Sequence, residues 1–591
     1  MDDSDPQDIF ELALIDPRAG DVEDDASSTK QRKLSAIAGS ILAEISIAKF
    51  LLAWLLLIGL PGLLLGAGPL ILTAWLSRVT DKVATLSGLG SILLLGLLAL
   101  VGLYGLRPLV RLVENNFWAL QAIAVQPVYG LFREGLSQLA EKRLSPNSDM
   151  NHRAKRRSAT ALAAGLLSSA LGLSLFALAW PHTQWHGTFA DLANPLRLAL
   201  PAIANATVIG GGYLAYASLL WAIADATMPQ PLALSANKSG SGGGTPSRIA
   251  HLSDLHIVGE PFGFRIESGR AGPRGNDRAY RLFDLLSKEH ARRPLDLVLI
   301  TGDMTDAGRS SEWIEFFSML ARHSELRART LILPGNHDLN VVDRSNPARL
   351  ELPASPSKQL RQLRTLSAMA AVQGDRVRVF DRATQRLGET LAERVAPYAD
   401  LIRSFADQKR LVRSTELAEL WANCFPQVLP PAHDHGLGVF LLNSNAESNF
   451  SFTNALGMLP TEDLKALRSI MDQYPTAGWI VGLHHHLIEY PMPVASLSER
   501  IGTALINGSW VVRQLNPVAV RLLVMHGHRH IDWIGRAGPL QIVSAPSPVM
   551  GARECDESCF YIHDIDVSPE GEVGLVHLEK IRVPGKNPVV A

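Results

Sequence analysis

The chain has 591 residues, with 56 Lys and Arg against 57 Asp and Glu, and its formal net charge is −1. A charge this close to zero argues against a protein held on nucleic acid by phosphate contacts alone, and we expect no specific nucleic-acid partner. Three cysteines exclude a disulfide-framed secreted scaffold, and a hydrophobic fraction of 47% excludes a mostly disordered chain.

The first 25 residues are rich in Asp and Glu and carry a single basic residue, Arg18. Such a run is usually solvated, and we expect an acidic disordered tail over residues 1–47. The run lacks the basic, apolar and small-residue order of a secretory signal, so we do not interpret it as one.

Four long apolar runs follow the tail, each near or above the roughly 20 residues that cross ~30 Å of hydrocarbon as a helix. No run has an acidic or basic residue in its central stretch, whereas a helix of a soluble core rarely stays apolar on every face. The runs predict an α-helical transmembrane bundle of about four spans within residues 48–225, in preference to four buried helices of a globular domain. They are Phe50–Leu76, Leu86–Leu106, Ala159–Trp180 and Leu196–Ile223.

The first run is longer than one span needs, and it contains Pro61, Gly62 and Pro69. It is either one kinked or tilted helix or a re-entrant hairpin, and a hairpin would change the number of crossings. The sequence leaves both possibilities open.

Lysine and arginine residues gather before the first run and in a basic loop over residues 107–158, and they are sparse in the other two loops. Positive residues stay on the cytoplasmic side, so both termini and the basic loop are predicted to be cytoplasmic. We therefore expect an integral protein of an inner or plasma membrane that contacts lipid through its transmembrane helices. The domain that follows the last run then faces the cytoplasm.

A linker over residues 226–246 contains the Gly- and Ser-rich stretch Ser239–Gly244. Stretches of this composition behave as flexible coil. The linker therefore marks a boundary between the membrane domain and a second domain over residues 247–591.

The second domain repeats one pattern five times: a short, β-rich apolar run leads into Asp, Asn or His. Continuous apolar strands predict sheets buried on both faces, and open α/β sheets place their sites at the carboxyl ends of strands. Helical segments such as Arg278–Glu289 lie between these runs, so the predicted fold class is α/β. The runs and their endings are Arg248–Leu252 with Asp254 and His256, Leu295–Thr301 with Asp303 and Asp306, Thr330–Pro334 with Asn336, His337 and Asp338, Trp479–Leu483 with His484, His485 and His486, and Val520–His526 with His528 and His530.

These residue types suit borderline divalent ions such as Mn, Fe, Zn or Co, and the absence of cysteine from the set argues against a structural zinc site. Two metals ~3.5–4 Å apart need a bridging carboxylate and can share a hydroxide. That hydroxide is a nucleophile at neutral pH because the metals lower the pKa of water. The ions also neutralise phosphate oxygens, and a histidine commonly protonates the leaving alkoxide.

The order D-x-H, G-D-x-x-D, G-N-H-D, H, G-H-x-H resembles that of the calcineurin-like metallophosphoesterases. The resemblance implies a four-layer α/β/β/α sandwich and two divalent metal ions of unknown identity. It implies that Asp303 bridges the metals, and that His337 contacts the phosphate and protonates the leaving oxygen, oriented by the carboxylate of Asp306 or Asp338. The implied ligands are Asp254, His256 and His530 for one metal, and Asn336, His484 and His528 for the other.

Three consecutive histidines, His484, His485 and His486, stand where the family normally shows one ligand. Successive residues of an extended strand point to opposite faces. Because His484 follows the strand most directly, we predict it as the ligand, with His485 and His486 next to the site.

The segment of about residues 341–435 is long for a loop and has Leu- and Arg-rich helical stretches, so we predict a helical insertion beside the metal site. Its arginines are candidates to bind substrate phosphate or anionic lipid, with a solvated helix face as the alternative for each: Arg361, Arg364, Arg376 and Arg378. The loop Gly259–Asn276, which contains Arg265, is a second candidate for substrate contact.

The combined features predict a membrane-anchored, metal-dependent phosphoric ester hydrolase, with a phosphodiester or a cyclic nucleotide as the favoured substrate. The alternative substrates are a phosphomonoester and a lipid-linked phosphate or pyrophosphate. An alternative of another class is a catalytically inactive domain of this fold that serves as a binding or regulatory module. The sequence leaves the exact substrate and the oligomeric state open.

Overall fold

The computed structural model describes residues 51–85 except 53 and 56–58, residues 93 and 96, and residues 125–142, 150–192, 195–234, 246–260, 262–268, 272–343, 349–351, 355–407, 414–448, 451–490, 505–551 and 556–585. The chain divides into two compact units that meet in the sequence at Met228 and Pro229. We call residues 46–228 the helical unit and residues 229–591 the two-sheet unit. The acidic tail expected over residues 1–47 lies outside the described residues.

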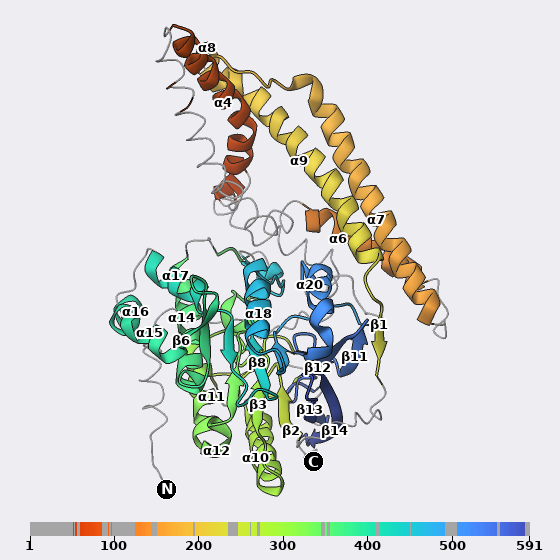
Figure 1. Cartoon of the computed structure of the whole chain (residues 1–591), viewed down its shortest axis with the longest axis vertical. Helices are drawn as coiled ribbons and strands as arrows, with labels where there is room; N and C mark the ends of the chain where they lie inside the picture. Colours follow the sequence, from red (N-terminus) through yellow and green to blue (C-terminus); the bar gives the residue numbers. More distant parts are fainter. Residues whose placement is uncertain are drawn as a thin grey trace. The chain divides into compact units, whose positions relative to one another are not determined.

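Helices form the described part of the helical unit (Figure 1), and many of their large apolar side chains are exposed. They are α4 (Leu60–Thr85), α6 (Gln126–Lys142), α7 (Met150–Ala179), η3 (Trp180–His182), α8 (Phe189–Leu192) and α9 (Pro195–Ala226). Large residues such as Leu178 are exposed, whereas small ones such as Ala164 and Ala202 are buried. A Cβ atom added at Gly172 on α7 would lie 2.6 Å from the carbonyl oxygen of Gly211 on α9, so the two backbones approach closely there.

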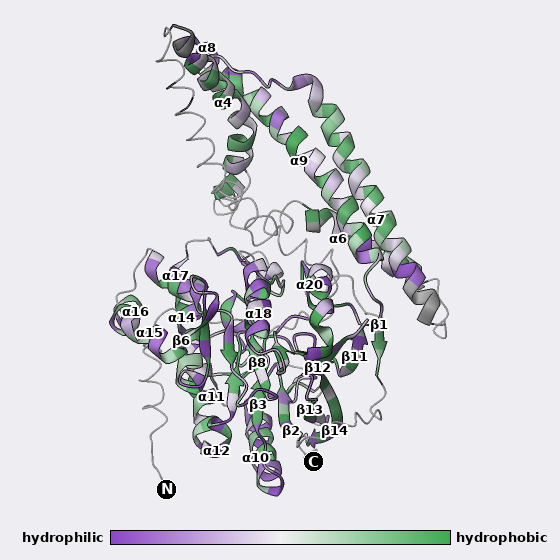
Figure 2. Ribbon diagram, viewed as in Figure 1, coloured by the Kyte–Doolittle hydropathy of each residue, from purple (hydrophilic) through white to green (hydrophobic). Residues whose placement is uncertain are grey.

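Three of the described helices are long and apolar enough to cross a membrane, by length and composition. Figure 2 shows apolar residues along much of α4, α7 and α9. The candidate spans are Leu60–Asp81, Lys155–His182 and Leu196–Ala226.

Three of the four apolar runs predicted from the sequence overlap these helices. The described part of the first run from Leu60 onward lies in α4, which continues past Pro69 to Thr85. The run Leu86–Leu106 lies outside the described residues except for Leu93 and Gly96, so the four-span bundle stays a prediction.

The two-sheet unit is built on two mixed sheets (Figure 1). The larger has nine strands in the order β1-β11-β12-β10-β9-β8-β7-β5-β6, and the smaller has five in the order β14-β13-β2-β3-β4. The strands are β1 (Pro231–Ala233), β2 (Ser247–Leu252), β3 (Leu297–Ile300), β4 (Thr330–Ile332), β5 (Arg378–Asp381), β6 (Arg386–Thr390), β7 (Gln427–Leu429), β8 (Leu437–Leu441), β9 (Gly478–Gly482), β10 (Leu522–His526), β11 (Trp533–Ala537), β12 (Leu540–Ser544), β13 (Ser558–Val567) and β14 (Val573–Val583).

Parallel strands form the middle of the larger sheet and one side of the smaller sheet. In the larger sheet β8, β9, β10 and β12 are parallel neighbours, and in the smaller sheet β2, β3 and β4 are. Every residue of β3, β9 and β10 is buried, as expected for strands covered on both faces. The α/β fold class is therefore confirmed for this unit.

Both sheets contribute to one hydrophobic core, which holds Val298 of β3 together with Ile480 of β9. Helices add their apolar faces to it; on α10 the buried Ala279, Leu282 and Leu286 recur at helical spacing. The helices of this unit are α10 (Asp277–Arg292), α11 (Ser310–Ala321), α12 (Ser324–Arg327), α13 (Asn336–Leu339), α14 (Pro356–Gln373), α15 (Leu391–Val395), η5 (Ala396–Tyr398), α16 (Ala399–Asp407), α17 (Thr415–Asn423), η6 (Ser451–Thr453), α18 (Thr461–Gln473), α20 (Gly508–Leu515) and η7 (Asn516–Arg521).

The segment over residues 341–435, for which we predicted a helical insertion, contains strands as well as helices. Its helices α14 to α17 are accompanied by β5, β6 and β7, which extend the larger sheet beyond β8. The pairings among β8, β7, β5 and β6 are all antiparallel. The segment therefore continues the sheet and also adds helices beside it.

Candidate metal centre

Polar side chains gather where five parallel strands end. Asp254 and His256 follow β2, Asp303 follows β3, and Asn336 opens α13 just after β4. In the other sheet His484 follows β9, and His528 and His530 follow β10. Because the carboxyl ends of parallel neighbours lie at one edge of a sheet, the fold brings residues that are far apart in sequence together.

A first group consists of Asp254, His256 and His530, whose ligand atoms lie within 4.8 Å of one another. Nε2 of His530 is 3.3 Å from Oδ1 of Asp254 and 3.3 Å from Nε2 of His256. The other ring nitrogens face carboxylates, with Nδ1 of His256 3.2 Å from Asp306 and Nδ1 of His530 3.2 Å from Glu267. These carboxylates favour a proton on each Nδ1, so two Nε2 lone pairs face each other. A cation between them relieves that repulsion, which fits a metal site.

A second group consists of Asp303, His484 and His528. Nδ1 of His484 donates to the main-chain oxygen of Thr301 at 2.8 Å, since a carbonyl can only accept. Nε2 of His484 therefore faces the other ligands, at 3.1 Å from Oδ1 of Asn336 and 3.1 Å from Nδ1 of His528. All the side chains of this group are buried.

Asp303 lies between the two groups. Its Oδ2 is 3.2 Å from Nε2 of His484 and 3.7 Å from Nε2 of His256. Its Oδ1 accepts a hydrogen bond from the main-chain N–H of His337 at 2.8 Å, which fixes the carboxylate in place. One carboxylate thus has an oxygen that faces both sets of ligands, as a bridging ligand requires.

The electrostatics of this cluster follow from its burial and its opposite charges. Burial opposes ionisation of Asp303, but the neighbouring His484 and His337 outweigh it and hold the pKa of the carboxyl well below its usual range. Burial lowers the pKa of His484, but Asp303 raises it overall to about 9. Burial and the neighbouring histidines hold the pKa of His528 far below its usual value. Metal ligands bind in their deprotonated form, so an ion held here would compete with the proton that Asp303 favours on His484.

The backbone at the site is strained. Asp254, His256, Asp303, His528 and His530 have φ angles between 46° and 76°. Only one other described non-glycine residue has a positive φ. Such conformations cost on the order of 1–3 kcal/mol each and persist where the surrounding structure fixes them. Here main-chain bonds between neighbouring strand ends do so, for example from the N–H of His256 to the oxygen of Asp303 at 3.0 Å.

His337 is held by the main chain, and not by a carboxylate as we predicted. Its Nδ1 lies 2.6 Å from the carbonyl oxygen of Asp306, whereas the carboxylate of Asp306 faces His256. The carboxylate of Asp338 accepts hydrogen bonds from Thr305 and from the N–H of Gly335. It therefore fixes the turn between β4 and α13, because the short side chain of Asp338 caps that helix.

The two histidines after His484 have partners of their own. Nδ1 of His485 lies 2.9 Å from Oγ of Ser444, and Nε2 of His486 lies 3.5 Å from Glu489. Burial and the neighbouring His484 hold the pKa of His485 well below its usual value. Among the three, His484 is the one whose ring lies within the second group.

Sequence reasoning did not single out Glu267 or Ser444. Glu267 lies in the loop Gly259–Asn276, where only arginines were considered, and it faces His530. Ser444 follows β8 and accepts the main-chain N–H groups of both His484 and His485 at 3.1 Å. A carboxylate in an irregular loop and a serine after a strand are too common to be recognised without the fold.

Most of the arginines considered for substrate contact are engaged in the fold. Arg265 is buried and donates to the main-chain oxygen of Pro273. The four arginines of the 341–435 segment each donate to main-chain oxygens: Arg361 to Leu339, Arg364 to Gly308, Arg376 to Thr330 and Val372, and Arg378 to Gly388. These contacts hold helices and strands together, so they give the arginines a structural role.

Residues 247–532 match the family model described as calcineurin-like phosphoesterase. No curated protein matches the chain. Among solved structures, a dimetal phosphatase from Danio rerio is 14% identical, with 58% of this chain and 100% of that chain covered and a TM-score of 0.31. A purple acid phosphatase from yellow lupin is 12% identical (58% and 53% covered, TM-score 0.28). A calcineurin-like phosphoesterase from Bacillus subtilis is 11% identical (57% and 91%, TM-score 0.25). The chain thus spans about half the length of the lupin protein.

Proposed function

We propose that the calcineurin-like phosphoesterase domain formed by residues 247–532 hydrolyses a phosphoester with the help of two divalent metal ions. The observation that carries the proposal is the position of Asp303, whose Oδ2 faces the ligand nitrogens of both groups. A phosphodiester or a cyclic nucleotide is the favoured substrate.

Seven side chains would hold the metals. Asp254, His256 and His530 would bind one ion, Asn336, His484 and His528 would bind the other, and Asp303 would bridge them. When bound, divalent ions of the Mn, Fe, Zn or Co type supply Lewis acidity towards phosphate oxygens and lower the pKa of water. The carboxylates of Asp306 and Glu267 would keep the rings of His256 and His530 in the ligating orientation.

His337 is the proposed general acid. Because its Nδ1 is held by the carbonyl oxygen of Asp306, its Nε2 is left to meet the substrate, and that nitrogen has no hydrogen-bond partner among the described residues. In its protonated form the ring can give the Nε2 proton to the leaving oxygen. Asp306 and Asp338 support this step by fixing the loops that carry the ring.

The helical unit is proposed to anchor the domain in a membrane. Its three candidate spans and their exposed leucines support this role. The basic residues over 107–158 support a cytoplasmic position for that loop, and with it for the catalytic domain. Reporter fusions placed after residues 142 and 226 would both be active on the cytoplasmic side only; a periplasmic or extracellular signal at either point overturns the orientation.

Hydrolysis of bis-p-nitrophenyl phosphate by the purified full chain, with and without Mn²⁺, tests the catalytic proposal. We expect metal-dependent turnover, two metal ions per chain by elemental analysis, and a loss of both in Asp303→Ala. Metal-free protein with no turnover would instead support an inactive binding module. Faster turnover of p-nitrophenyl phosphate than of the diester would reassign the domain to phosphomonoesters.

A further inference from the structure

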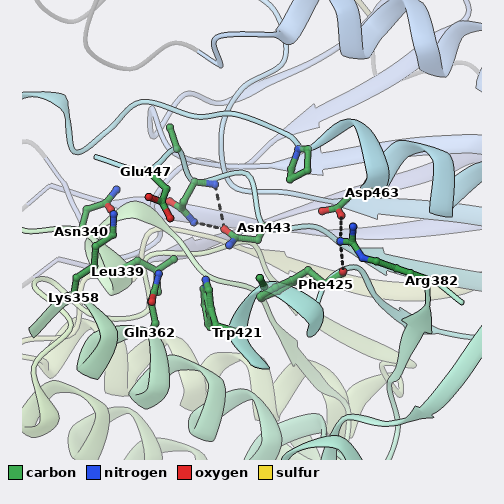
Figure 3. Close-up of a pocket in the computed structure, with 14 residues that line it drawn as sticks. Leu339, Asn340, Lys358, Gln362, Arg382, Trp421, Phe425, Asn443, Glu447 and Asp463 are labelled. Atoms are coloured by element: carbon green, nitrogen blue, oxygen red, sulfur yellow. Dashed lines mark hydrogen bonds and ion pairs between the residues drawn. The ribbon is translucent and has the colours of Figure 1, made fainter. Parts of the chain in front are cut away.

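A cavity of about 280 Å³ lies in the two-sheet unit, between the strand ends that follow β4 and β8 and the helices α14 and α17 (Figure 3). It is small for a ligand pocket, just below the usual range of about 300–1,000 Å³. Its lining combines aromatic rings with the amide side chains of four residues: Asn340, Gln362, Asn443 and Asn445.

The cavity begins about one helical turn from the metal centre. Asn340 donates its main-chain N–H to the oxygen of Asn336 at 2.9 Å, so these residues are one turn, ~5.4 Å, apart along α13. On the other side, Nδ2 of Asn445 donates to the oxygen of Pro334, two residues before Asn336. A ligand whose phosphate lies at the metals can therefore reach the cavity with a neighbouring group.

Several polar groups that face the cavity have no partner. Gln362 is only 6% exposed, and its amide makes no hydrogen bond to any described residue. Nδ2 of Asn445 donates hydrogen bonds to the main-chain oxygen of Pro334 and to Oδ1 of Asn443. The acceptor that remains on Asn445 is its Oδ1, and this oxygen is buried without a partner. An acceptor left buried and unpaired, as Oδ1 of Asn445 is, is costly, so a ligand that supplies its partner and also meets the Gln362 amide is expected to bind.

Two aromatic rings form a wall of the same cavity. The rings of Trp421 and Phe425 lie 5.2 Å apart at 72°, and the indole N–H of Trp421 makes no hydrogen bond to a described residue. Figure 3 shows Trp421 and Gln362 next to each other and directed into the space below Asn443. The wall thus offers both a surface for stacking and a donor.

The charged side chains that line the cavity balance, with Lys358 and Arg382 against Glu447 and Asp463, so the lining does not favour a second anion. Arg382 pairs with Asp463 at 3.4 Å, and Lys358 donates to the main-chain oxygen of Ser448. Glu447 is exposed and adds negative charge at the rim. The group that enters is therefore neutral, polar and flat enough to lie against an aromatic wall.

We propose that this cavity binds the base of a nucleoside phosphate whose phosphate lies at the metal centre. Amide side chains match the donor and acceptor edges of bases, and bases stack on aromatic rings. An acyl chain would leave the amides unpaired. The proposal rests on the proposed function for the position of the phosphate, and it narrows the substrate class to nucleotides.

Calorimetric titration of adenosine, guanosine, cytidine and uridine into the full chain in detergent tests the cavity without relying on catalysis. We expect at least one nucleoside to bind, about tenfold more weakly in Gln362→Leu, which removes one set of hydrogen bonds at nearly constant size. Asn423→Ala, an exposed amide at the end of α17, is the matched control and should bind like the wild type. Failure of all four nucleosides to bind, or equal binding by Gln362→Leu, overturns the proposal.

A second variant distinguishes the loss of a binding contact from misfolding of the protein. Trp421→Phe keeps the aromatic wall but removes the indole donor, and we expect nucleoside binding to weaken several-fold at an unchanged thermal unfolding midpoint. Nucleoside binding that is unchanged in Trp421→Phe would also count against the cavity.

The outcomes separate this proposal from the proposed function. Metal-dependent hydrolysis of bis-p-nitrophenyl phosphate without nucleoside binding would overturn the base site and leave the hydrolase standing. Nucleoside binding without any hydrolysis would support the base site and remove the hydrolase. In an active enzyme, Gln362→Leu should raise KM for the nucleotide about tenfold relative to KM for ribose 5-phosphate.

Discussion

The helical unit and the two-sheet unit differ most in the residues that they expose. In the helical unit alanines such as Ala164 and Ala222 are buried while leucines such as Leu178 and Leu196 are exposed. In the two-sheet unit Trp313 and other aromatic residues are buried. Among the described residues, the exposed large apolar side chains of that unit are few, namely Leu232, Phe262, Ile314 and Val520.

The difference shows what each unit has to satisfy. In the proposed membrane setting, the helices of the helical unit gain from close backbone contact, because lipid tails are as apolar as leucine and cannot drive helices together. The two-sheet unit buries apolar surface against water, and the stability gained supports buried charges and positive φ angles at its metal centre. The ordinary hydrophobic content of the chain is therefore an average over two opposite patterns of burial.

The largest expected effect comes from Gly302→Ala in the two-sheet unit. Gly302 has a φ of +99°, and an added Cβ would lie 2.4 Å from Nδ1 of His484. Alanine therefore displaces the His484 ring, and we expect metal-dependent turnover of bis-p-nitrophenyl phosphate to fall by about a hundredfold or more. Gly574→Ala is the matched control, because nothing lies within 4 Å of its added Cβ. A Gly302→Ala protein that keeps two metals and full turnover would contradict this account of the site.

Much of the two-sheet unit could be predicted because its signals are local. Each apolar run that ends in Asp, Asn or His encodes a buried strand and its end, and those ends meet once the strands are parallel. The short strands β5 and β6 were not predicted, since Arg386–Thr390 is mostly polar and lies at the sheet edge, where apolar periodicity is weak.

The parts that could not be predicted depend on contacts between distant residues. Nothing near Asp306 in the sequence indicates that its carboxylate faces His256 while its carbonyl oxygen holds His337. Gln362 and Asn445 are 83 residues apart in the sequence, and they line one cavity only through the pairing of β7 with β8 and the packing of α14. Local patterns carry no information on such pairings.

A second prediction concerns a buried carboxyl group of the two-sheet unit. Burial, together with the nearby charge of Asp306, raises the pKa of Glu312 on α11 to about 8. The folded state therefore holds one more proton than the unfolded state between about pH 4.5 and 8, so the free energy of unfolding falls as pH rises through this window.

Glu312→Gln should remove that part of the pH dependence, on the order of a few kcal/mol, because the amide still accepts from Ala307 and Arg309 but does not ionise. The measurement is the temperature of half-inactivation at pH 6 and pH 8.5. Glu416→Gln, at an exposed position on α17, should keep the pH dependence that the wild type shows in its temperature of half-inactivation. If the temperature of half-inactivation changes with pH equally in wild type and in Glu312→Gln, Glu312 is ionised in the folded state.

In the helical unit the corresponding prediction concerns the close packing of α7 against α9. A Cβ added at Gly211 would lie 2.7 Å from the carbonyl oxygen of Gly172, whereas nothing lies within 4 Å of one added at the neighbouring Gly210. We expect Gly211→Ala to destabilise the pair α7 and α9 by about 2 kcal/mol, as overpacking usually does. Gly210→Ala should be neutral or slightly stabilising. Thermal unfolding in detergent measures both, and equal behaviour of the two variants would argue against the close approach of these helices.

We expect the smallest effect from Glu267→Gln, which tests how the loop Gly259–Asn276 supports the metal centre. Glu267 faces Nδ1 of His530 at 3.2 Å, so Glu267→Gln keeps the shape of the contact but removes the charge that favours a proton on Nδ1. We expect metal affinity to fall about tenfold, with little change in turnover at saturating metal, because the ligand set itself is intact. Glu260→Gln, at an exposed position of the same loop, serves as the control. Metal titrations followed by turnover distinguish the outcomes: a fall in turnover at saturating Mn²⁺ would mean that Glu267 acts on the reaction itself, and unchanged affinity would mean that the ring of His530 is held without it.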